Sequence, residues 1–175
     1  ESLVLVTVAM NFKQKGGDIV RDAYIRLKPR FPSLCWHVIG GAPDSKTASL
    51  PGVSYEGILN PGVLRERMRM SSILAEAFLL VHPTREDVSP LVITEAADQG
   101  CPAGSGNLFA MPELVLNGRT GLLVNSPPSA REVADAIETV LLDRKGYLLM
   151  REAARSYSIE KFSWERTGKV ICDSI

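Results

Sequence analysis

The stretch "AEAFLLVHPTREDVSPLVITEAADQ", residues 75–99, indicates the fold of this chain. It opens with an apolar run of strand length, continues through a polar loop and then repeats apolar residues in a segment that starts at a Ser-Pro pair. Strands with few polar residues that are followed by amphipathic helices are typical of a parallel sheet. We therefore expect a buried strand over residues 75–82 and a helix from Ser89 to about Gln99.

The same alternation runs through the rest of the chain. The apolar run "LVLVTVA" of residues 3–9 precedes Ile19, Ala23 and Leu27 at helical spacing, and Pro32 stops that helix. This pattern predicts one doubly wound, Rossmann-like α/β domain over residues 1–175, with a parallel sheet and helices on both faces. Further strands are expected at residues 35–40, 53–57, near Ala103 and 120–124, and further helices at 60–72, 111–116 and from Ser129 onward.

Composition excludes several classes of function. The formal net charge is zero, so bulk charge offers no attraction to nucleic acid or to an anionic membrane. Cys35, Cys101 and Cys172 lie far apart, which disfavours a disulfide framework and a zinc site and suits a reducing, cytoplasmic compartment. No apolar run has the length of a membrane span, and the chain starts without Met or a basic signal segment. We expect a piece of a longer protein.

The acidic residues of the opening stretch need an explanation. Asp87 and Ser89 are good N-cap residues, and Pro90 suits the first turn of a helix, so capping alone explains the first acids. Capping does not explain Glu95, which falls inside the expected helix. From the residues alone, Glu95 is a solvated helix position or a binding group.

Six motifs in one order resemble the C-terminal half of GT-B fold glycosyltransferases. They are "KGG" at 15–17, "GILNPGVL" at 57–64, "PTREDVSPLVITEA" at 83–96, "MPELV" at 111–115, "NGRTGLLV" at 117–124 and "FSWER" at 162–166. The likeness is to the large retaining family, the family-four or group 1 type, and covers nearly the whole chain. It implies a domain that binds a nucleotide sugar, with the acceptor domain in a missing N-terminal half. Any peripheral membrane contact is left to that half.

The family signature is a pair of acidic residues separated by seven others, here Asp87 and Glu95. The resemblance implies that Asp87 faces the donor hexose as a catalytic residue and that Glu95 binds the ribose. A carboxylate can accept hydrogen bonds from two vicinal hydroxyls at once. The N–H groups of Val88, Ser89 and Leu91, at the positive end of the helix, would meet the diphosphate.

The loop after the first strand matches the family's phosphate-binding segment. Lys15 takes the place of the phosphate-binding lysine and, by the resemblance, stabilises the leaving diphosphate as a second catalytic residue. The family usually has an arginine five residues earlier, where this chain has Met10. Lys13 and Arg85 are the candidate substitutes. The alternative is that the loop lysines are simply solvated.

A second loop matches the region that meets the nucleobase. The main chain at Ile58 and Leu59 would contact the base, with Leu64 as an apolar wall; the alternative is an ordinary strand-to-helix loop. Two departures weaken the phosphate cradle. Phe109 begins a Phe-Ala pair where Gly-Gly is common, and Pro90 removes an amide donor.

The remaining conspicuous residues have structural interpretations. His37 and His82, at strand ends without metal-ligand or triad spacing, are expected to be hydrogen-bonded histidines rather than catalysts. Met68 and Met70 are expected to pack their helix rather than to form a binding surface. Trp164, just after a Ser163 N-cap, is expected to anchor the terminal helix.

Together these features predict transfer of a hexose from a nucleoside diphosphate sugar, with retention, without a metal ion and with no cofactor beyond the donor. The isolated domain is expected to be inactive. A non-catalytic nucleotide-sugar-binding or assembly subunit and a sugar-nucleotide epimerase are the alternatives.

Overall fold

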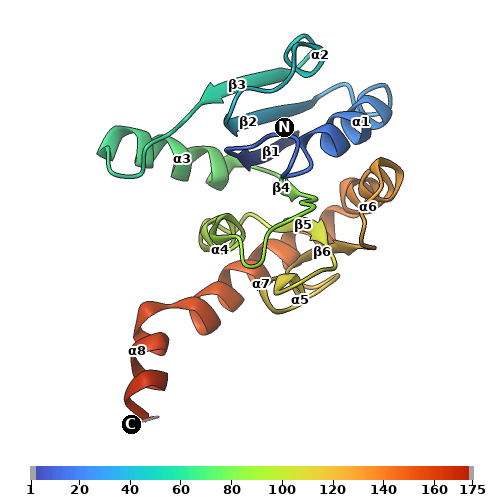
Figure 1. Cartoon of the computed structure of the whole chain (residues 1–175). Coiled ribbons are helices and arrows are strands. Elements are labelled where there is room, and N and C mark those ends of the chain that lie inside the picture. The colour runs from blue at the N-terminus through green and yellow to red at the C-terminus, as the bar shows by residue number, and fades with distance from the viewer. Residues whose placement is uncertain (1–2, 174–175) are drawn as a thin grey trace.

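The computed structural model describes residues 3–173 and contains a six-stranded parallel sheet in the order β3-β2-β1-β4-β5-β6 (Figure 1). The strands are β1 (Leu3–Ala9), β2 (Leu34–Gly40), β3 (Val53–Gly57), β4 (Leu79–His82), β5 (Ala103–Gly106) and β6 (Gly121–Val124). In chain order, β2 and β3 are added on one side of β1, and the chain then crosses back to place β4 on the other side of β1. The topological switch point therefore lies between β1 and β4, as in doubly wound dinucleotide-binding folds.

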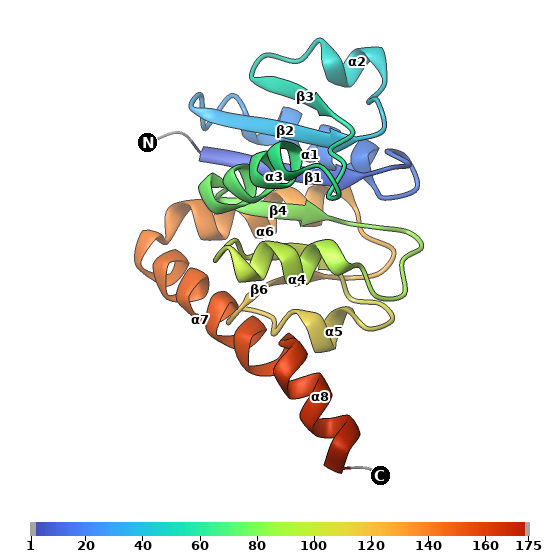
Figure 2. The same cartoon turned by 90° about the vertical axis from the view of Figure 1, so that its left-hand side faces the viewer.

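Helices cover both faces of the sheet, which confirms the predicted fold class. Figure 1 shows α1 and α6 on one side and α3 and α4 on the other, and Figure 2 shows α7 running from beside α6 past α4 to α8. The helices are α1 (Gly17–Leu27), α2 (Ser45–Ala48), α3 (Leu64–Glu76), α4 (Leu91–Asp98), α5 (Met111–Leu114), α6 (Ala130–Leu142), α7 (Arg144–Phe162) and α8 (Trp164–Asp173).

Alternation of side chains along β4 explains why its first three residues are all apolar. Successive strand residues point to opposite faces. Leu79 and Val81 belong to the core that α1 and α6 cover, whereas Leu80 belongs to the core under α3 and α4. All three are buried, so the apolar run of the opening stretch serves two cores at once.

A buried chain of hydrogen bonds ties the three central strands together. Trp36 of β2 donates its indole N–H to Thr7 Oγ1 of β1 at 3.0 Å, and Thr7 Oγ1 donates to the Val81 carbonyl of β4 at 3.2 Å. Each polar atom has a partner, so the polar groups cost little inside the core. These hydrogen bonds fix the positions of β2, β1 and β4 relative to one another.

Several predicted boundaries were wrong. The helix expected at residues 60–72 begins at Leu64, because Val63 N–H donates to the Asn60 carbonyl at 3.0 Å and closes a turn first. That helix then runs to Glu76, so the strand expected from residue 75 begins at Leu79.

The C-terminal helix departs from the sheet (Figure 2). Ser163 Oγ accepts the Arg166 N–H at 3.3 Å, which is the predicted cap. Trp164, however, is 89% exposed, so its predicted anchoring role was wrong within the part of the chain described here. None of the helices in residues 3–173 combines the length and the apolar character that crossing a membrane requires.

Candidate functional site

Two loops meet at the switch point, one after β1 (residues 10–16) and one after β4 (residues 83–90), as Figure 2 shows at one end of the sheet. The Arg85 N–H donates to the Gln14 carbonyl at 3.2 Å. The Gln14 side chain in turn donates to Glu86 Oε2 at 3.0 Å. These contacts join segments far apart in sequence into one wall, at the place where open α/β sheets bind ligands.

Lys15 and Asp87 form an ion pair in this wall. Lys15 Nζ lies 2.6 Å from Asp87 Oδ2 and also donates to the Glu86 carbonyl at 3.1 Å. The Lys15 side chain is 24% exposed and that of Asp87 is 19% exposed, so both charges remain accessible. His82 Nε2 lies 3.2 Å from the same Asp87 oxygen. The fold thus brings together the two residues predicted to carry chemistry.

Helix capping does not account for Asp87 or Ser89. α4 begins at Leu91, its N-cap is Pro90, and no side chain caps it. Asp87 makes its contacts with Lys15 and His82 instead, because the loop turns its carboxylate toward the first strand. Since the first N–H groups of a helix have no partner within it, the start of α4 still presents amides to the loop side.

The ion pair borders an open hollow of about 590 Å³ whose lining includes Lys15, Asp87, Val88, Ser89 and Phe109. Phe109 has φ 48°, a left-handed conformation that bulky residues rarely adopt. The backbone of Phe109 therefore has a conformation typical of glycine, at the position where the resembled family has Gly-Gly. Its phenyl ring is exposed, where a glycine would have no side chain. A strained residue beside an ion pair is typical of a functional site.

A second cavity, of about 400 Å³, lies against the carboxyl ends of β1 and β2. Ile58 and Leu59 of the loop after β3 line one part of it, and Glu95 of α4 lines another. The structure thus brings together three of the four residues that were predicted to bind the nucleoside. Its mostly apolar lining with a few charged groups suits a ligand that has an aromatic base and a polar sugar.

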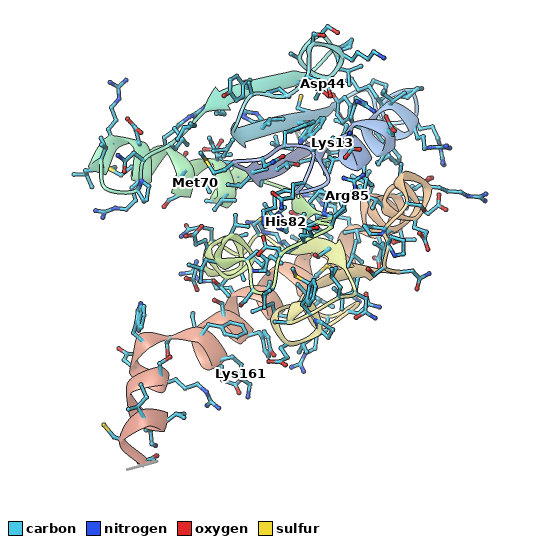
Figure 3. All side chains as sticks on the ribbon, in the orientation of Figure 1. Lys13, Asp44, Met70, His82, Arg85 and Lys161 are labelled. Carbon is cyan, nitrogen blue, oxygen red and sulfur yellow. The ribbon has the colours of Figure 1, made fainter. Side chains whose placement is uncertain are left out.

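The α3 side of this cavity differs from the prediction. Leu64 does not line it and is exposed at the first turn of α3; Arg67 and Met70 form that wall instead. Figure 3 labels Met70 on α3. Met70 packs against the core as predicted, whereas Met68 is exposed and its predicted packing role was wrong. Met10 lines the cavity and is 67% exposed, where the resembled family has an arginine.

Glu95 is exposed on the surface of α4 and is partly covered where it lines the cavity. This partial loss of water raises the pKa of its carboxyl group, and the nearby charge of Asp98 raises that pKa further. Among residues 3–173, no group donates a hydrogen bond to the Glu95 carboxylate. An incoming hydroxyl pair would therefore restore interactions that the free chain does not supply.

Lys13 and Arg85 are the candidates to replace the missing arginine. Of these two, only Lys13 has a charged group without an ion-pair partner among the described residues. Arg85 makes a two-pronged contact with Asp18, at 2.8 and 3.0 Å, and donates to the Lys13 carbonyl at 2.6 Å (Figure 3). The Lys13 ammonium group contacts no other charged group of the described chain and borders a third, open hollow with Met10.

The two histidines differ. His37 Nδ1 lies 2.8 Å from Glu56 Oε1, as expected for a hydrogen-bonded strand residue. His82 was predicted to be equally satisfied, but its Nδ1 has no partner among the described residues. Its contact with Asp87 was missed, although a histidine ending a buried strand five residues before an acid was a usable signal. No cluster of three or more His, Cys, Asp or Glu side chains suited to a metal occurs within residues 3–173.

The model of the family described as "Glycosyl transferases group 1" matches residues 1–143. The GDP-mannose-dependent alpha-(1-6)-phosphatidylinositol monomannoside mannosyltransferase of Mycolicibacterium smegmatis is 28% identical over 174 residues, which are 94% of this chain and 45% of that protein. The chain therefore spans less than half the length of this relative.

Two solved structures share the fold. HepE of Anabaena in complex with UDP-glucose aligns with a TM-score of 0.82 at 19% identity, over 99% of this chain and 48% of that chain. The C-terminal domain of the glycosyl transferase group 1 family protein LpcC of Francisella tularensis aligns with a TM-score of 0.73 at 18% identity, over 92% of this chain and 86% of that chain. The predicted fold, one half of a GT-B glycosyltransferase, is confirmed.

Proposed function

The chain belongs to the glycosyl transferases group 1 family, and we propose that it forms the half of a hexosyltransferase that binds the sugar donor. One observation carries the proposal: Lys15 and Asp87 meet at the switch point, in the same edge of the sheet as the cavity that Glu95 lines. A cation for a diphosphate and two carboxylates for hydroxyls are the groups that a nucleoside diphosphate sugar requires.

Each part of the donor then has a protein partner. The base contacts the main chain at Ile58 and Leu59, and the ribose hydroxyls donate to Glu95. Lys15 and the amides at the start of α4 bind the diphosphate, and Asp87 accepts hydrogen bonds from the hexose. The relative from Mycolicibacterium smegmatis is named for GDP-mannose and HepE was solved with UDP-glucose, which supports a nucleoside diphosphate hexose as donor class.

Transfer requires that the bond between the hexose and the diphosphate breaks. We propose that Lys15 and the α4 amides stabilise the charge that develops on the leaving diphosphate, so that the step needs no metal ion. A hydroxyl oxygen of the acceptor then bonds to the hexose carbon that the diphosphate leaves, and retention requires that it does so from the same face. The acceptor site belongs to the rest of the protein. Without it, the bound donor stays open to water, and we expect no transfer by this chain alone.

Calorimetric titration of the chain with UDP, GDP and ADP tests donor binding. We expect dissociation constants on the order of tens of micromolar to millimolar, because the crevice has only one wall. Glu95→Gln keeps the shape and removes the charge, so binding should weaken by roughly 1–3 kcal/mol. Unchanged affinity with a folded variant would rule out ribose binding by Glu95.

A non-catalytic subunit that binds nucleotide sugars remains the second candidate. The observation in its favour is Met10, which places an exposed apolar side chain where the family has a cation. Assaying the full-length protein for sugar transfer decides between the two. Donor binding without any transfer would favour the non-catalytic subunit.

A further inference from the structure

We propose that His82 is a positioning residue for Asp87, which holds the Asp87 carboxylate in place when Lys15 turns from it to the diphosphate of the donor. The inference rests on the proposed function. It concerns a histidine that neither the family motif nor the sequence pattern assigned to the site.

His82 is fixed more firmly than any other group that touches Asp87. It is the last residue of β4, it is 1% exposed, and its carbonyl accepts the Ser105 hydroxyl at 2.9 Å (Figure 3). β4 also pairs with β5 at His82 and Ser105. The imidazole therefore has no room to change position, in contrast to a lysine on a four-carbon stem.

The surroundings select one protonation state of the ring. Burial lowers the pKa of His82 more than the neighbouring Asp87 raises it, so the ring is neutral. A proton on Nδ1 would leave a buried donor without a partner and turn the Nε2 lone pair toward a carboxylate. A proton on Nε2 instead donates to Asp87 Oδ2, at 3.2 Å. The neutral Nε2–H tautomer is therefore the favoured state.

Lys15 and His82 contact the same oxygen of Asp87. Lys15 Nζ lies 2.6 Å from Oδ2, and no described residue contacts Oδ1. When a diphosphate draws Lys15 away, the carboxylate loses its strongest partner in a partly desolvated crevice. The His82 bond keeps Oδ2 in place and leaves Oδ1 directed to a ligand. His82 thus acts on the hexose through Asp87 and does not touch the donor itself.

The test compares how the chain binds UDP-glucose with how it binds UDP, and GDP-mannose with GDP. His82→Phe keeps a planar ring and removes the donor. We expect it to weaken binding of the sugar nucleotides about five- to tenfold, and that of the free diphosphates less than about twofold, because only the hexose contact depends on Asp87. His82→Gln retains an N–H at a similar reach and should restore much of the loss.

Ser105→Ala is the matched control. It removes the bond to the His82 carbonyl at the same buried strand end but leaves the imidazole contact with Asp87 intact. It should therefore lower stability without changing the preference for sugar nucleotides. Equal weakening of sugar nucleotides and free diphosphates by His82→Phe, or no weakening at all, would overturn the positioning role.

Nitrogen-15 NMR of the wild-type imidazole gives a readout that needs no variant to fold. We expect the proton on Nε2 and a bare Nδ1, with the same tautomer after UDP-glucose is added. A proton on Nδ1 overturns the inference. Failure of the wild-type chain to bind any nucleotide contradicts the proposed function, and the inference with it. Normal wild-type preference with unaffected His82→Phe contradicts the inference alone.

Discussion

Lys15 and Asp87 form an ion pair in the free chain, so each charged group already has a partner before any ligand binds. Lys15 Nζ is 2.6 Å from Asp87 Oδ2, shorter than its 3.1 Å bond to the Glu86 carbonyl. Under the proposed function, a diphosphate would compete with Asp87 for the ammonium group, and the hexose would compete with Lys15 for the carboxylate. The two parts of the donor would then bind best together, because each part releases the protein group that the other part binds.

Substitution of Lys15 separates diphosphate binding from nucleoside binding. Lys15→Ala should weaken UDP or GDP binding by about 1–4 kcal/mol, because a point charge near 4 Å acts mainly on the anion. Binding of uridine or guanosine should change little. Lys161→Ala, which removes an exposed lysine of α7, is the charge-matched control. Equal losses for diphosphate and nucleoside would mean that Lys15 only shapes its loop.

Glu95 should lower the stability of the free chain near neutral pH. Partial burial raises the pKa of Glu95 above the ordinary value of 4.5. At a pH between 4.5 and the raised pKa, the native chain therefore binds more protons than the unfolded chain. Stability then falls as pH rises through that window. Glu95→Gln should raise the melting temperature at pH 7, with a smaller gain at pH 4. A gain that is independent of pH would contradict the desolvated carboxylate.

At the scale of elements, the sequence predicted the strand and helix alternation because the buried strands are mostly apolar. Boundaries were less accurate where a polar turn precedes a helix, as at Asn60 before α3 and at Asp87 before α4. Good capping residues occupy both places, but hydrogen bonds of the turn or partners from another loop take their polar groups. Local sequence does not reveal such distant competitors.

Helix α6 shows the opposite case, in which the local signal holds. Ser129 Oγ accepts a hydrogen bond from the Glu132 N–H at 3.2 Å, and Glu132 Oε2 accepts one from the Ser129 N–H. Ser129→Ala should lower the free energy of unfolding by about 0.5–2 kcal/mol. Because α6 covers the face of the sheet away from α3 and α4, nucleotide affinity should stay the same. Urea titration measures the first effect, and a parallel loss of affinity would mean that the site depends on α6.

For the whole molecule, motif order alone indicated one half of a GT-B fold, but strand order and contacts across the sheet did not follow from it. The Lys15–Asp87 pair joins the loops of two strands that are neighbours only because the chain crosses back to β4. The spacing of His82 and Asp87 was a usable signal for their pairing, but nothing local fixes which way a loop carboxylate turns. The resemblance supplied the residues, and the fold supplied their arrangement.

The most direct test of the central claim is a map of where a nucleotide sugar binds. Amide NMR shifts of the labelled chain, recorded during titration with UDP-glucose and GDP-mannose, should change together at Lys15, Ile58, Val88, Ser89, Leu91 and Glu95. All of these residues except Leu91, which begins α4, line one of the two hollows. Saturable shifts confined to them would support donor binding across this edge of the sheet. Shifts elsewhere, or none at millimolar ligand, would contradict it.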